Sequence, residues 1–138
     1  MTSLLRVTLA CLALSAAVPG LYATFSASGF YGDFPFGRGW VQMLPPYNEH
    51  LIRDVGDFYL AFTILFAWAA WRPSRELVLP LASAWSVAAV LHAVYHSLHL
   101  DGFGAGDGIA LIAVLVTVLA LPVLAIVITL RERVPMQA

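Results

Sequence analysis

The sequence predicts an all-α polytopic membrane protein in which four transmembrane helices form an up-down bundle. Hydrophobic residues make up 61% of the 138-residue chain and charged residues only 11%, and the mean hydropathy is +0.85. A soluble domain is much less apolar. Four apolar segments follow one another, each close to the length of about 20 residues that a helix needs to cross a bilayer. We expect these helices at about 4–21, 51–71, 77–99 and 109–130, in a single domain that covers 1–138.

The first segment, 4–21, has some features of a secretory signal peptide. Arg6 precedes an apolar run, and small residues follow at 26–28. However, the apolar run is long for a signal peptide, and no clear cleavage site follows it. We therefore interpret the segment as a retained transmembrane helix.

A long loop at 22–49 separates the first helix from the second. It contains eight of the chain's 17 aromatic residues, spaced by glycines and prolines. Such a segment is too long for a simple helix connection and is typical of the headgroup level of a bilayer. We expect it to act either as a lid over the bundle or as an interfacial anchor with no further role.

The three later segments have recognisable ends. Asn48, which follows two prolines, can cap the start of the second helix. The third helix should stop at the Asp101-Gly102 pair. Asp107 is a reasonable N-cap for the fourth helix, and Pro122 should kink it.

The arginines predict how the bundle is oriented. All seven basic residues are arginines, and only Arg38 and Arg53 lie on the side of the long loop. The five arginines on the opposite side are Arg6, Arg72, Arg75, Arg131 and Arg133. The positive-inside rule then predicts a multi-pass membrane protein with both termini in the cytoplasm. A net charge of −1 provides no basic surface for nucleic acid.

Two polar stripes are the strongest functional signal. Each has residues at i, i+4 and i+7, a spacing that places three side chains within about 60° on one helix face. Ionisable groups inside membrane helices are costly, so two such stripes indicate a functional site. The stripes are His50, Asp54 and Asp57 in the segment 51–71 and its N-terminal extension, and His92, His96 and His99 in the segment 77–99.

The stripes are predicted to lie at matching depths. The uncharged part of the second helix, 58–71, is only about 21 Å long, whereas the hydrocarbon core is about 30 Å thick. The helix must therefore continue outward through its carboxylates. Because a short turn joins the second and third helices, we expect them to be antiparallel neighbours. The expected pairs are Asp57 with His92, Asp54 with His96, and His50 with His99.

These six side chains predict a metal site between the second and third helices. Imidazoles and carboxylates suit a transition metal, zinc first, with iron, manganese and copper as alternatives. Glu49, Arg53 and Tyr95 would surround the ligands and orient them. A metal-free network of aspartates and histidines is the main alternative. Haem held by two histidines is a weaker alternative, because it leaves the carboxylates unexplained.

Two stretches, YNEHLIRDVG at 47–56 and HSLHLDGF at 96–103, together with GLY at 20–22, carry a resemblance to a known family. With these motifs the chain resembles a family of small four-helix bacterial integral membrane proteins of unknown function. The resemblance covers nearly the whole chain. It implies the fold and a location in a bacterial cell membrane, and it implies no activity.

Two classes of function remain open at this point. As an enzyme, the protein would use its metal to activate water or oxygen on a lipid-soluble substrate that enters laterally beneath the loop. As a non-catalytic subunit of a larger membrane complex or a homo-oligomer, it would use the polar stripes for packing or proton relay. No phosphate-binding loop and no Ser-His-Asp or H-E-x-x-H motif is present. The lone Cys11 excludes an internal disulfide.

Overall fold

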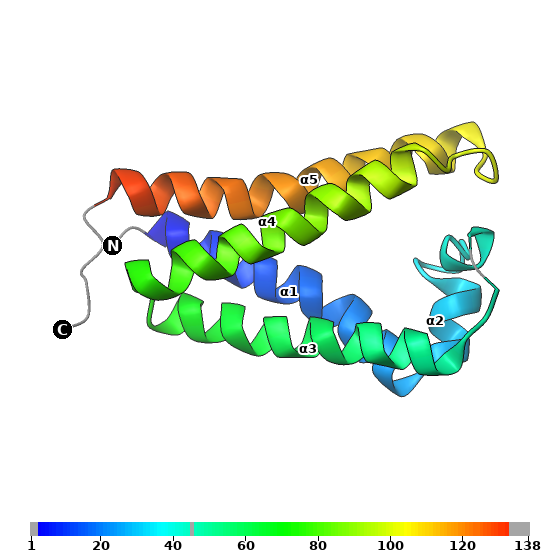
Figure 1. Cartoon of the computed structure of the whole chain (residues 1–138), viewed down its shortest axis with the longest axis horizontal. Helices are drawn as coiled ribbons and strands as arrows, with labels where there is room; N and C mark the ends of the chain where they lie inside the picture. The colour runs from blue at the N-terminus through cyan, green and yellow to red at the C-terminus, as the bar shows by residue number, and fades with distance from the viewer. Residues whose placement is uncertain (1–2, 45, 133–138) are drawn as a thin grey trace.

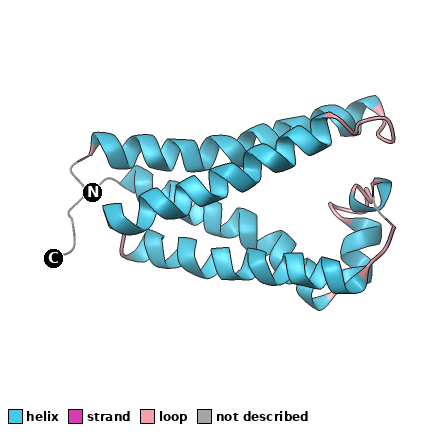
Figure 2. Ribbon diagram, viewed as in Figure 1, coloured by secondary structure: helices cyan, strands magenta, loops and turns pink. Residues whose placement is uncertain are grey.

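The chain is helical almost throughout. The computed structural model describes residues 3–44 and 46–132, and no strand occurs within these two ranges (Figure 2). The predicted all-α class is therefore confirmed. The elements are α1 (Ser3–Phe25), α2 (Ala27–Asp33), the 3₁₀ helix η1 (Val41–Met43), α3 (Glu49–Trp71), α4 (Arg75–Ser97) and α5 (Ala105–Arg131).

Three of the long helices, rather than the predicted four, are long and apolar enough to cross a membrane. Among the described residues these are α1, α4 and α5. The predicted span at 51–71 corresponds to α3, which is not one of them. The physical reason is its acidic and basic residues, all of which lie in its first half and lower its hydropathy: Glu49, Arg53, Asp54 and Asp57.

The local signals at the helix ends had mixed success. The predicted cap of α3 is confirmed, since the Asn48 side chain accepts a hydrogen bond of 3.1 Å from the Leu51 amide. The predicted cap of α5 is wrong: Gly104 is the N-cap residue, and Asp107 lies within the first turn of the helix. The long loop also carries more structure than expected, because α2 and η1 both form within it.

Helices α1 and α3 are antiparallel and pack along their length (Figure 1). Two glycines allow the close approach. A Cβ atom on Gly20 would lie 3.1 Å from the side chains of Tyr59 and Leu60, and one on Gly56 would lie 2.7 Å from the backbone nitrogen of Thr24. A larger residue at Gly56 would therefore push the helices apart. Small residues commonly serve this purpose between transmembrane helices.

Arginines at opposite ends of the same helix pair cap each other's helix. The Arg6 guanidinium donates to the carbonyl oxygens of Ala70 (2.9 Å) and Trp71 (2.7 Å) at the end of α3. The Arg53 guanidinium donates to the carbonyl oxygen of Thr24 at the end of α1. The last carbonyls of a helix have no partner within the helix, and a cation there also interacts favourably with the helix dipole. The α1–α3 pair is thus fastened at both ends.

The second pair consists of α4 and α5, which also pack against each other. The two pairs share one core, formed near the turn between α3 and α4 by the start of α1, the end of α3, the start of α4 and the end of α5. Phe66 and Trp85 lie in this core with ring centroids 5.4 Å apart. Away from this end the pairs diverge, and α3 and α4 separate (Figure 1).

Candidate functional site

Asp57, the innermost residue of the α3 stripe, is turned toward α1. Thr24 Oγ1 lies at the end of α1 and donates a 2.9 Å hydrogen bond to Asp57 Oδ1. Arg53 binds the Thr24 carbonyl and forms a 2.8 Å ion pair with Glu49. The Arg53–Glu49 pair has the i, i+4 spacing that brings two side chains together on one helix face. The acidic start of α3 serves contacts between α3 and α1.

The outermost member of this stripe is exposed. His50 Nε2 lies 3.3 Å from Asp54 Oδ2, one helical turn away, and 87% of the His50 side chain is exposed. An exposed pair of this kind contributes little to stability. Within the described residues, neither side chain is brought to a histidine of α4.

The histidine stripe of α4 forms a separate group. The rings of His92 and His96 make an edge-to-face contact with centroids 4.4 Å apart. One turn further on, His99 Nδ1 lies 2.7 Å from the Tyr95 carbonyl oxygen. The His99 ring also stacks on the Tyr95 ring at 4.2 Å. The spacing thus predicts a shared face correctly for His92 and His96, whereas α4 ends at Ser97 and His99 lies beyond the helix.

The predicted pairing of the α3 stripe with the histidines of the 77–99 segment is wrong. Helices α3 and α4 meet at the turn that joins them and then diverge, while α3 packs mainly on α1 (Figure 1). In the ranges 3–44 and 46–132, no group of three or more His, Cys, Asp or Glu side chains is placed to hold a metal ion. Metal binding itself stays a prediction.

The diverging helices flank a large, partly open cavity next to His92 and His96. Its volume is about 980 Å³, and side chains from α1, α3, α4, α5 and the loop after α2 line it. The lining is mostly apolar and includes Leu14 and Val18 of α1 and Val114 of α5. His92 and His96 lie on its α4 wall. The cavity, rather than the α3–α4 interface, is therefore where the histidines can meet a ligand.

The loop at 34–44, which we call the lid, lines the end of this cavity away from the shared core. Two side chains fasten it to α5. Arg38 forms a 2.5 Å ion pair with Asp107 Oδ1, and Trp40 Nε1 donates to the same oxygen at 3.0 Å. Trp40 is buried in a cluster with Leu111 and Leu115. The lid therefore links the α1–α3 pair to the α4–α5 pair at their open end.

Two buried polar atoms at the cavity have no hydrogen-bond partner among the described residues. They are Nδ1 of His96 and Nε1 of Trp85, and both residues line the cavity. The Trp85 ring is packed among Tyr59, Phe62 and Phe66. A polar atom that is buried without a partner is destabilising, so such atoms frequently mark functional sites.

The ion pair between Arg38 and Asp107 is not predicted from the sequence. The sequence indicates Asp107 only as a helix cap and Arg38 only as one of two arginines on the side of the long loop. A usable signal was present, because a guanidinium within a loop of aromatic residues needs a counter-charge. Other carboxylates, however, lie closer to Arg38 in the sequence than Asp107 does. Only the fold brings these two residues together.

Comparisons with known proteins add no family to these observations. No family model, curated protein or solved structure matches the chain. The resemblance to small four-helix bacterial membrane proteins therefore stays a prediction, and the candidate site rests on its own geometry.

Proposed function

We propose that this chain is a multi-pass membrane protein that binds a lipid-soluble molecule in the cavity between its two helix pairs. The observation that carries the proposal is the cavity of about 980 Å³, which is mostly apolar but has two histidines on its wall. Ligand sites typically have volumes of about 300–1,000 Å³, with a few polar groups in an apolar lining.

The depth of the cavity supports a ligand that comes from the bilayer. At about 1.5 Å per residue, Trp85 lies about 15 Å and His96 about 32 Å along α4 from Arg75. The cavity then falls within the outer half of a membrane with a core of about 30 Å. Leu14, Val18 and Val114 line it, and more than half of each residue is exposed. We propose that a molecule dissolved in the lipid enters from the side past these apolar residues.

The ends of the cavity argue against a transmembrane helix of another protein as the occupant. The lid lines one end and the shared core lies at the other, so a continuous helix has no path along the cavity. A small molecule is the better fit.

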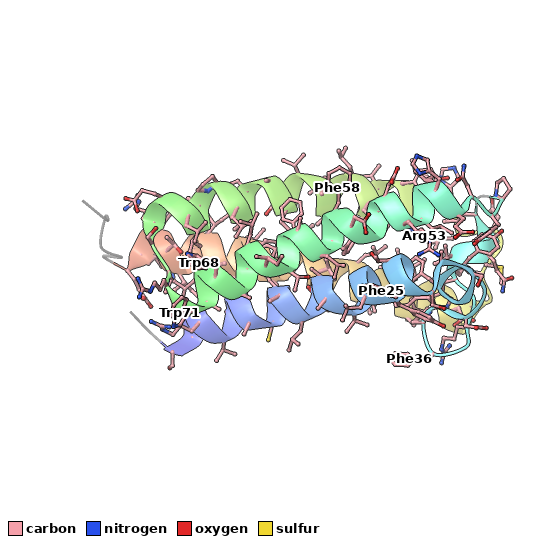
Figure 3. All side chains as sticks on the ribbon, turned by 90° about the horizontal axis from the view of Figure 1, so that it is seen from below. Phe25, Phe36, Arg53, Phe58, Trp68 and Trp71 are labelled. Carbon is pink, nitrogen blue, oxygen red and sulfur yellow. The ribbon has the colours of Figure 1, made fainter. Side chains whose placement is uncertain are left out.

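The proposed orientation follows from the end of the molecule opposite the cavity. Trp68 and Trp71 are exposed at this end with centroids 5.4 Å apart, and the Arg72 guanidinium lies 4.6 Å from the Trp71 ring centroid (Figure 3). Tryptophan and arginine together are typical of a cytoplasmic membrane interface. Arg6 and Arg75 lie at the same end, whereas Arg133 falls outside the described residues. We place the cavity on the outward side of a bacterial cell membrane.

The test is the molecule that accompanies the purified protein. Protein extracted with a mild detergent should retain a lipid-soluble compound, identified by mass spectrometry of an organic extract. Val114→Phe should reduce its occupancy about tenfold, because overpacking of a site commonly costs at least about 1.4 kcal/mol. Val116→Phe is the matched control, since Val116 is exposed on α5 but does not line the cavity. A second polypeptide in place of a small molecule would favour the complex-subunit alternative.

Metal binding is a second candidate, and the contact between His92 and His96 favours it. Two imidazoles one turn apart can share an ion whose other ligands are water or ligand oxygens. Elemental analysis of protein purified without a histidine tag should then find about one ion per chain, zinc first. His92→Ala and His96→Ala should each remove it. Asp57→Asn should not, because Asp57 is bound to Thr24. Metal-free wild-type protein would eliminate this candidate.

A further inference from the structure

We infer that the ligand of the cavity is an uncharged amphiphile, with an apolar body and a hydrogen-bonding polar group near His92 and His96. This inference rests on the proposed function and narrows its substrate class. It depends on how the charges around the cavity are already paired.

The cavity has no unpaired permanent cation for an anionic headgroup. Among the described residues that line it, Arg38 is the only arginine. Its guanidinium is already neutralised by Asp107 at 2.5 Å. A carboxylate or phosphate placed beside Arg38 would have to displace Asp107 or compete with it. An anionic amphiphile therefore gains little from this site and still loses hydration when it leaves the interface.

A cationic headgroup is not favoured either. Asp107 is shared by Arg38 and Trp40, so its charge is also satisfied. Asp33 lines the cavity from the end of α2, but the residue is exposed. A carboxylate near water attracts a cation only weakly because the solvent screens it.

The remaining polar groups recognise uncharged partners well. A neutral imidazole has one nitrogen that donates and one that accepts a hydrogen bond, and an indole N–H donates. His92 and His96 line the cavity and bring these imidazole groups to its wall. A hydroxyl or carbonyl group carried by an apolar molecule can form hydrogen bonds with these imidazoles without bringing a net charge into the cavity. The polar groups of the cavity therefore favour a ligand that is polar but carries no net charge.

The chain's own tryptophans provide the assay. Trp40 and Trp85 line the cavity, whereas Trp68 and Trp71 lie on the exposed surface at the other end (Figure 3). In a Trp68→Phe, Trp71→Phe background, quenching by a brominated amphiphile reports occupancy of the cavity. Three probes with the same dibrominated alkyl chain are compared: an alcohol, an alkyl sulfate and an alkyltrimethylammonium. Tryptophan octyl ester in protein-free vesicles corrects for partition into the lipid.

The alcohol should reach half-quenching at a concentration at least about tenfold lower than either charged probe, measured near pH 8, where ordinary imidazoles are neutral. Asp107→Asn, which frees the Arg38 guanidinium, should improve binding of the alkyl sulfate and reduce this preference to about threefold or less. The matched control is Arg38→Gln with Asp107→Asn, which removes the pair without leaving a cation. This double variant should keep the preference for the alcohol.

The outcomes separate the inference from the function on which it rests. Quenching by all three probes that does not exceed the protein-free control would overturn both. Specific quenching in which the sulfate binds as well as the alcohol would overturn the inference and leave the proposed function standing. Tighter binding of the ammonium probe would also overturn it and would point to Asp33 as the recognition group.

Discussion

The two helix pairs use similar residues in different ways. In the α1–α3 pair, glycines bring the backbones together, and Arg53 and Asp57 of α3 are bound to Thr24 in the last turn of α1. In the α4–α5 pair, the histidines of α4 lie on the wall of a cavity, and His96 Nδ1 has no partner among the described residues. Asp57 of the first stripe is used by the scaffold, whereas His92 and His96 of the second stay available for a ligand. The same i, i+4, i+7 spacing therefore occurs in two stripes whose side chains have different roles.

The largest effect should come from breaking the close approach in the first pair. Gly56→Leu places its Cβ 2.7 Å from the Thr24 backbone nitrogen, a contact that backbone atoms cannot relieve without moving. We expect the protein to lose about 3 kcal/mol of stability or fail to fold, since overpacking at a helix contact costs this much. Thermal unfolding in detergent measures the change.

Gly106→Ala is the control for this substitution. A Cβ at Gly106 meets no atom within 4 Å, and the residue lies in a helix, where alanine is favoured over glycine. Its stability should be unchanged or slightly higher. Equal destabilisation by both substitutions would mean that α1 and α3 do not pack through Gly56.

Removing either arginine that caps the partner helix should have the next largest effect on stability. Arg6→Met and Arg53→Met each remove a charged donor from the end of the partner helix. We expect each to lower the free energy of unfolding by about 1–2 kcal/mol, as for a hydrogen bond from a charged group. Arg75→Met, which removes no hydrogen bond or ion pair found among the described residues, should cost less than about 0.5 kcal/mol. A negligible effect of both Arg6→Met and Arg53→Met would contradict capping.

Breaking the contact between Arg38 of the lid and Asp107 of α5 should have the smallest effect on stability. Its main effect should be on the mobility of the lid. Arg38→Gln removes a partly exposed ion pair, in which the side chains of Arg38 and Asp107 are 53% and 35% exposed. The expected loss of stability is therefore below about 1 kcal/mol. In the Trp68→Phe, Trp71→Phe background, acrylamide should quench the fluorescence of buried Trp40 more strongly than in the parent. Unchanged quenching would show that the apolar contacts of Trp40 alone hold the lid.

The sequence predicted what depends on local spacing. Apolar length gave the long helices, Asn48 gave the start of α3, and the i, i+4, i+7 spacing placed His92 and His96 on one face. It did not predict which neighbour each face meets. That choice depends on the contact of Gly56 with Thr24, between residues far apart in the chain, and no short pattern encodes it. The cavity was missed for the same reason.

The direction in which the α3 stripe faces is the central claim, and disulfide crosslinking tests it most directly. In a Cys11→Ser background, Thr24→Cys with Asp57→Cys joins two positions whose native side chains are within hydrogen-bonding distance, at 2.9 Å. Asp57→Cys with His92→Cys joins the two stripes instead. The structure predicts that the first pair forms a disulfide readily under mild oxidation in membranes and that the second does not. Faster crosslinking of the second pair would contradict the account and restore a His/Asp site between α3 and α4.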